Sequence, residues 1–113
     1  MINRTALLDG LQELSSAKVQ RELWIEGDTN RMSSFTEAIS YTFDDSGVAR
    51  AIDRGDLENE TSKEIANQLQ FLRTLIRSVP QRVTPAEIMR SPNMPKIRSV
   101  AREILMLLSK GTE

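Results

Sequence analysis

The feature that most constrains the fold is a run of apolar residues at helical spacing between positions 61 and 79. Ile65, Leu69 and Leu72 follow one another by four and then three residues, which places them on one face of an α-helix. Pro80 closes the run, because proline lacks the backbone N–H that a continuing helix needs. The sequence therefore predicts a long amphipathic helix that buries one face.

Start and stop signals divide the rest of the chain into further helices. Ser34 precedes Glu37, and Thr84 precedes Glu87, with the spacing of a capping box that satisfies free backbone N–H groups. Gly55 follows a short apolar run and marks a helix end. We therefore predict an all-α fold, a compact bundle of five or six helices in a single domain over residues 1–113. The predicted helices cover about residues 5–24, 35–43, 48–54, 61–79, 85–90 and 94–109, of which the longest single helices are 61–79 and 94–109.

The first of these helices has two weak points. Gly10 lowers its intrinsic helix propensity, and Ser15 with Ser16 either interrupts or ends it. We expect Thr5 to cap its start, and Asn93 to cap the last helix of the chain. Residues 56–60 are polar and are predicted to form a linker.

The chain contains neither cysteine nor histidine, which removes much of the common catalytic and metal chemistry. Disulfides, zinc ribbons, thiolate nucleophiles, Ser-His-Asp triads and histidine-ligated metals are all excluded. Carboxylates, Lys, Arg, Ser/Thr and Tyr41 remain, and they converge on no catalytic motif. We expect a protein that is not an enzyme and uses no cofactor or metal. A small helical enzyme with an electrostatic pocket of Arg, Lys and Glu stays a minor alternative.

The sequence shows no segment that would direct the chain to a membrane or across it. The N-terminal stretch is interrupted by Asp9 and Glu13, so it lacks the apolar centre of a signal peptide. No apolar run approaches the length of a membrane span. We therefore expect a cytoplasmic protein that has no membrane partner.

The net charge of −1 conceals two halves of opposite sign. Residues 1–60 carry six basic and twelve acidic side chains, whereas residues 61–113 carry nine basic and four acidic ones. Opposite potentials on two surfaces steer and orient binding partners. The alternative is that the acidic helices pack against the basic ones and neutralise them internally. The sequence leaves both open.

The acidic half supplies the first candidate site, in which segment 34–60 would face a basic protein surface. A calcium loop is disfavoured because positions 44–47 lack alternating ligands and Gly55 stands where a glutamate is needed. Capping of the helix 48–54 by Asp44, Asp45 or Ser46 is the preferred alternative. Trp24 is either an exposed anchor for the partner or, more commonly for a lone tryptophan, a core residue. The candidate partner-binding residues are Trp24, Asp28, Asp44, Asp45, Asp53 and Asp56.

The basic half supplies the alternative site, a footprint for phosphate or another anion. Arg73 and Arg77 are four residues apart, as are Arg98 and Arg102, so each pair shares one helix face. Nucleic-acid binding is weakened because Phe71 is the only aromatic residue in this half. A helix-turn-helix motif is also disfavoured, because its turn would hold two prolines and no glycine.

Taken together, these patterns favour a non-enzymatic protein–protein interaction module. A small bacterial-type regulator, antagonist or immunity-like protein would fit this description. The expected partner is another protein or a second copy of the chain, with helices 61–79 and 94–109 as the seam of a homodimer. Nucleic-acid binding through the basic helices is the alternative from a different functional class.

Overall fold

The computed structural model describes residues 2–27, 32–80 and 82–110. Within these ranges every regular element is helical and none is a strand, which confirms the all-α class. The structure divides into eight α-helical and two π-helical segments, more than the five or six helices expected. In chain order they are α1 (Arg4–Ser15), α2 (Ala17–Gln20), η1 (Arg21–Ile25), α3 (Phe35–Ile39), η2 (Ser40–Asp45), α4 (Val48–Arg54), α5 (Leu57–Glu60), α6 (Lys63–Arg77), α7 (Pro85–Met89) and α8 (Met94–Lys110).

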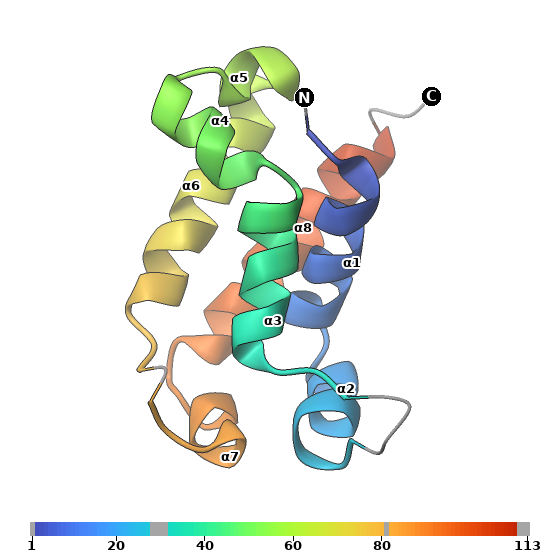
Figure 1. The fold of residues 1–113 in the computed structure, drawn as a ribbon, viewed down its shortest axis with the longest axis vertical. Helices are drawn as coiled ribbons and strands as arrows, with labels where there is room; N and C mark the ends of the chain where they lie inside the picture. Colours follow the sequence, from blue (N-terminus) through green and yellow to red (C-terminus); the bar gives the residue numbers. More distant parts are fainter. Residues whose placement is uncertain (1, 28–31, 81, 111–113) are drawn as a thin grey trace.

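The long helices α1, α6 and α8, together with α3, make up the middle of the molecule, and the other short helices lie at its two ends (Figure 1). α1 packs against α8 and against η2, which continues directly from α3, and α6 packs against α8. α4 and α5 lie at one end, whereas α2 and α7 lie at the other (Figure 1). None of the helices in the described ranges is both long enough and apolar enough to cross a bilayer.

The apolar stripes predicted for the long helices face inward and join in one connected core. Complete burial of one Leu or Ile side chain contributes about 1.5–3 kcal/mol, so these stripes supply much of the stability of the fold. The large side chains of the long helices that are most completely buried are Leu7, Leu11 and Leu14 of α1, Leu69 and Leu72 of α6, and Met94, Ile97 and Ile104 of α8.

Several helix ends follow the predicted capping signals. The Ser34 hydroxyl accepts the backbone N–H of Glu37 at 3.1 Å, and the Thr84 hydroxyl accepts that of Glu87 at 3.2 Å. Gly55 ends α4 with a φ of 74°, in the left-handed region where a side chain would be strained. Local sequence is sufficient for these ends because both partners of each cap lie within one turn.

Other ends differ from the prediction. α1 is capped by Asn3 rather than Thr5, since the Asn3 side chain accepts the N–H of Ala6 at 3.1 Å. Residues 57–60 form the helix α5 instead of a linker, because Leu57 is 2% exposed and anchors the segment in the core. α6 spans residues 63–77 rather than 61–79.

The starts of α4 and α8 show which of the predicted side chains act as caps. At the start of α4 the expected cap is confirmed for one of the three candidates, since the Ser46 hydroxyl accepts the backbone N–H of Val48 at 3.1 Å. The Asn93 side chain, expected to cap α8, donates to the Ser78 hydroxyl at 2.5 Å. That bond ties the start of α8 to the end of α6.

Gly10 lies where α1 crosses η2. A Cβ atom at this position would overlap the Thr42 hydroxyl and would lie 2.7 Å from the Thr42 backbone nitrogen. The absence of a side chain therefore permits the two helices to approach, and this tertiary role is invisible to helix propensity alone.

Candidate functional site

Trp24 belongs to the core and is not an exposed anchor. Its side chain is 7% exposed and packs edge-on against Phe35, with the ring centroids 5.7 Å apart. The indole N–H donates to a carboxylate oxygen of buried Glu13 at 2.8 Å, so the polar end of the ring is also satisfied. Trp24 is therefore removed from the candidate binding surface. Asp28, another member of the acidic set, lies outside the described residues.

A hollow of about 230 Å³ lies where the α3–η2 helix, α4 and α6 meet, and we call it the mixed-charge hollow. Four of its seven lining residues are apolar, and the other three are charged, with both signs present. Asp44, a candidate for binding a basic protein partner, thus lies beside Arg73 and Arg77, which are candidates for the alternative anion site. Its lining residues are Ile39, Phe43, Ala49 and Ile76, with Asp44, Arg73 and Arg77.

Part of the acidic set faces cations of the same chain. Asp53 lies 3.8 Å from the Arg73 guanidinium, and Asp56 lies 3.4 Å from that of Arg54. These pairs are weak, because the side chain of Asp53 is 71% exposed and water screens it. Asp44 and Asp45 are exposed and make no ion pair within the described part of the chain. The acidic and basic halves are therefore partly complementary within the fold.

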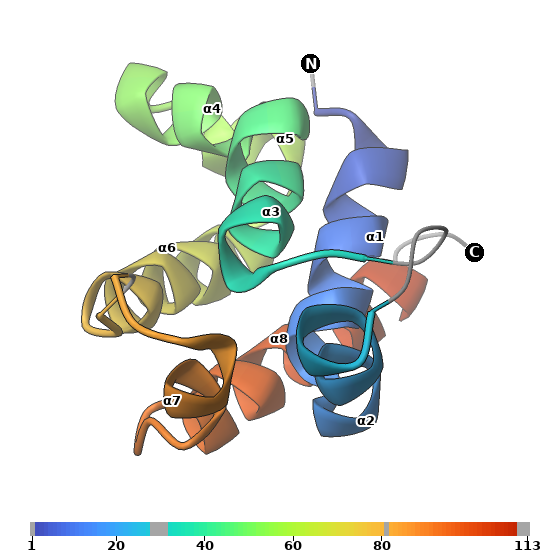
Figure 2. The same ribbon diagram turned by 60° about the horizontal axis from the view of Figure 1, so that its bottom comes forward.

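A second hollow, of about 320 Å³, opens between α2–η1, α7 and the first half of α8, and we call it the arginine hollow. Figure 2 shows α2 and α7 on either side of α8 at this end of the molecule. Three guanidinium-bearing residues line it, from η1, from the end of α7 and from α8, and no carboxylate-bearing residue among those that the structure describes belongs to the lining. The lining consists of Ala17, Arg21, Ile25, Ala86, Met89, Arg90 and Arg98.

Arg98 is held in this hollow by a buried amide. Gln20 is completely buried, and its side-chain N–H groups donate to the carbonyls of Glu13 at 3.2 Å and Leu14 at 2.9 Å. Its carbonyl oxygen accepts the Nε–H of Arg98 at 2.9 Å. Burial, followed by the charges of Arg102 and Arg21, holds the pKa of Arg98 below its usual range. The guanidinium remains charged at neutral pH, since arginine does not lose its proton in proteins.

The four arginines of the predicted anion footprint are not brought into one site. Arg73 and Arg77 line the mixed-charge hollow, whereas Arg98 lines the arginine hollow, and the two hollows share no lining residue. Arg102 is exposed on α8, close enough to Arg98 to influence it electrostatically.

Arg21 is a site residue that sequence reasoning missed, whereas Arg90 belongs to the basic half of the chain but to neither of the two predicted arginine pairs. Only the packing of α7 and η1 beside α8 gives them a shared environment with Arg98. No signal in a single sequence identifies such a meeting of three segments.

The two π-helical segments each contribute to one of these hollows. η1 supplies Arg21 and Ile25 to the arginine hollow, and η2 supplies Phe43 and Asp44 to the mixed-charge hollow. π-helical turns are rare, and they are frequently found at functional sites. Their wider turn changes which side chains emerge on a given face.

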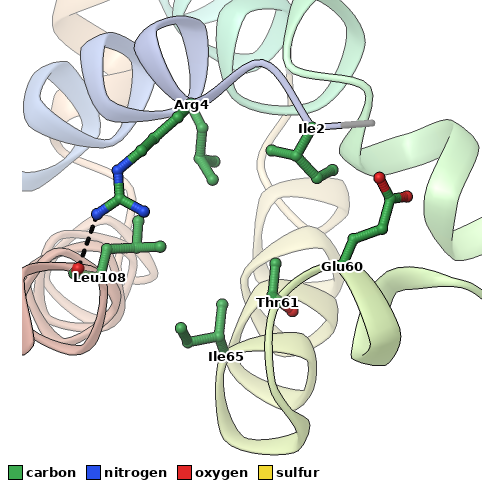
Figure 3. A pocket seen from close by; sticks show the side chains of 7 residues that line it. Ile2, Arg4, Glu60, Thr61, Ile65 and Leu108 are labelled. Carbon is green, nitrogen blue, oxygen red and sulfur yellow. Dashed lines mark hydrogen bonds between the residues drawn. The ribbon is translucent and has the colours of Figure 1, made fainter. Parts of the chain in front are cut away.

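A third hollow, of about 370 Å³, lies between the start of α1, the α5–α6 junction and the end of α8 (Figure 3). Arg4 reaches across it and donates to the backbone carbonyl of Leu108 at 2.7 Å. The Thr61 hydroxyl donates to the carbonyl of Leu57 at 2.7 Å. Because these polar groups serve helix ends, we assign this hollow a structural role.

Among the described residues, 2–27, 32–80 and 82–110, no three carboxylates are grouped closely enough to hold one metal ion. Asp44, Asp45 and Asp53 are exposed, and Asp56 is half-buried. Comparisons of the chain with protein-family models, with curated protein sequences and with solved structures found no match.

Proposed function

We propose that this protein is a non-enzymatic module that binds a partner protein through the mixed-charge hollow. The observation that carries the proposal is an apolar floor, including Phe43 and Ile76, bordered by charges of both signs. Protein interfaces have this anatomy, with an apolar centre and a polar rim. The hollow is small, so it suits one large apolar side chain of the partner better than a free organic ligand.

The charges around the hollow define what the partner must present. Asp44 favours a cation, whereas Arg77 favours a carboxylate, and an apolar side chain would lie between them. A protein segment carries all three features in a few residues. A small regulator, antagonist or immunity-like protein would act in this way, by occupying a surface rather than by catalysis.

Nucleic-acid binding is the less favoured alternative at this hollow. A phosphate that approached Arg73 would also meet the carboxylates of Asp44 and Asp53, and these would repel it. Phe71 on α6 is 42% exposed, but the ammonium group of Lys96 already lies 5.7 Å from its ring centre. No array of stacking platforms accompanies the basic residues.

The test begins with affinity purification on the intact protein, with and without nuclease, followed by titration calorimetry with the recovered partner. Asp44→Lys and Arg77→Glu should each weaken binding about tenfold or more, because each places a like charge against the partner. Ala49→Leu should weaken it as well, because the larger side chain fills the hollow without altering its charge.

Asp9→Lys is the matched control, since Asp9 is exposed on α1 and does not line the hollow. Its affinity for the partner should equal that of the unmodified protein. The proposal is wrong if the partner is lost on nuclease treatment, or if all four variants bind it equally well.

A further inference from the structure

The arginine hollow concentrates positive charge that the described part of the chain does not neutralise. Arg21, Arg90 and Arg98 line it together, and none of the three forms an ion pair with a described carboxylate. Bringing three like charges together costs free energy unless an anion joins them. A bound anion would offset this cost, so the cluster favours such a ligand.

The orientation of Arg98 is fixed in advance. Its Nε–H is occupied by the buried Gln20 carbonyl, and Gln20 is itself held by two backbone carbonyls at the end of α1. The terminal nitrogens of Arg98 have no hydrogen-bond acceptor among the described residues. A guanidinium anchored in this way presents its remaining N–H groups in a planar fork that matches the oxygens of an oxoanion.

The remaining lining residues indicate what else the ligand carries. Ala86 and Met89 of α7, together with Ile25 of η1, add apolar surface beside the guanidinium groups. A volume of about 320 Å³ lies at the lower end of the range of small-ligand sites, which is about 300–1,000 Å³. No aromatic residue lines the hollow, so it lacks the stacking surface that single-stranded nucleic acid uses.

We propose that the arginine hollow binds a phosphomonoester dianion, held by Arg21, Arg90 and Arg98, with the organic part of the ligand against Ala86 and Met89. The lowered pKa of Arg98 agrees with this arrangement, since its causes are burial and the charges of Arg102 and Arg21, and Arg98 forms no ion pair with a described carboxylate. This site shares no residue with the mixed-charge hollow, so the inference does not depend on the proposed protein-binding function.

The experiment is an NMR titration of the ¹⁵N-labelled full chain with phenyl phosphate, at an ionic strength kept constant with sodium chloride. We expect saturable shifts of the backbone amides of Arg21, Met89, Arg90 and Arg98. Inorganic phosphate is titrated in parallel. Tighter binding of phenyl phosphate supports the contact of the organic part with Ala86 and Met89, whereas equal binding contradicts that contact and identifies the free anion as the ligand.

Arg21→Gln and Arg90→Gln should each weaken phenyl phosphate binding about tenfold, the expected loss for one charge-assisted hydrogen bond. Both side chains are exposed and form no described ion pair or hydrogen bond, so these variants should fold normally. They keep the test valid even if Arg98→Gln, which also leaves Gln20 without its partner, is unstable. Arg50→Gln on α4 is the control and should bind as the unmodified protein does.

Three results would overturn the inference. The first is the absence of saturable shifts with either phosphate compound. The second is equal affinity in the Arg21, Arg90 and Arg50 variants, which would show that binding depends only on net charge. The third is a single-stranded oligonucleotide that displaces phenyl phosphate from the same amides and binds more tightly, which would identify a nucleic-acid backbone as the ligand.

Discussion

At Gly10 the backbone of α1 lies so close to η2 that a methyl group would overlap the Thr42 hydroxyl. Two effects therefore oppose each other at this residue. Replacement by alanine gains about 1 kcal/mol of helix propensity. Overpacking a tight contact costs about 1–3 kcal/mol, and here the obstacle includes Thr42 backbone atoms, which cannot rotate away.

We predict that Gly10→Ala lowers the free energy of unfolding by about 1 kcal/mol, because the overlap outweighs the propensity gain. Urea denaturation followed by circular dichroism measures the difference. Gln12→Ala, at an exposed position of the same helix, should change stability by less than about 0.5 kcal/mol. A Gly10→Ala variant that is more stable than the parent would show that α1 and η2 can separate at no cost.

At the scale of elements, the junction of α1 and α2 organises the arginine end of the molecule. Ser16 adopts an extended conformation between the helices, and its hydroxyl accepts the N–H of Val19 at 3.2 Å. The Gln20 side chain then turns back to the carbonyls of Glu13 and Leu14. The buried side-chain amide of Gln20 thus satisfies two carbonyls at the end of α1 and also holds Arg98 of α8 in place.

We predict that Gln20→Leu destabilises the protein by about 2 kcal/mol or more, although leucine is apolar and similar in size. Two buried carbonyls would lose their donors, and each unsatisfied buried group costs about 1–3 kcal/mol. Gln70→Leu, at an exposed position on α6, is the control and should be nearly neutral. Thermal unfolding of both variants compares them, and equal melting temperatures would contradict the role of the amide.

A second prediction at this scale concerns the two arginines one turn apart on α8. Burial contributes most to the lowered pKa of Arg98, and the charge of Arg102 contributes next by disfavouring the charged form. Arg102→Gln should therefore raise the free energy of unfolding by about 0.2–0.5 kcal/mol at low salt. The gain should shrink as salt increases, because ions screen the repulsion. A gain that is independent of salt would point to a cause other than charge.

At the scale of the whole molecule, the two halves of opposite charge are neither fully separated nor fully paired. Asp53 lies near Arg73 and Asp56 near Arg54, which realises part of the internal complementarity that the sequence left open. Arg21, Arg90 and Arg98 have no such counterpart among the described residues. Three arginines without a described ion pair therefore lie together at the end formed by α2 and α7.

This distribution predicts that phosphate raises the melting temperature more than chloride does at equal ionic strength. A ligand that binds only the folded state stabilises it by about 2.7 kcal/mol at one hundred times its Kd. Phosphate also stabilises proteins generally through exclusion from their surface, so the Arg21→Gln/Arg90→Gln double variant supplies the baseline. Scanning calorimetry should show a smaller phosphate effect in that variant, and an undiminished effect would exclude specific binding.

The positions of most helices, several of their caps and their inward faces could be predicted from the sequence, because these properties depend on residues within one or two turns. Ser34 with Glu37, Thr84 with Glu87 and the terminal Gly55 are examples. The predictions failed where a distant contact decides local structure. Residues 57–60, predicted to be part of a linker, form the helix α5 because the Leu57 side chain is buried in the core.

The sequence by itself determined an all-α chain with two long amphipathic helices and unequal charge in its halves. Only the tertiary structure decided which charges meet. Arg98 and Gln20 are 78 residues apart in the chain, and Asp44 and Arg77 come from different helices. The periodicity of apolar residues predicts which face of a helix is buried, but it does not predict which other helix packs against that face. The arginine hollow and the mixed-charge hollow therefore emerge from packing alone.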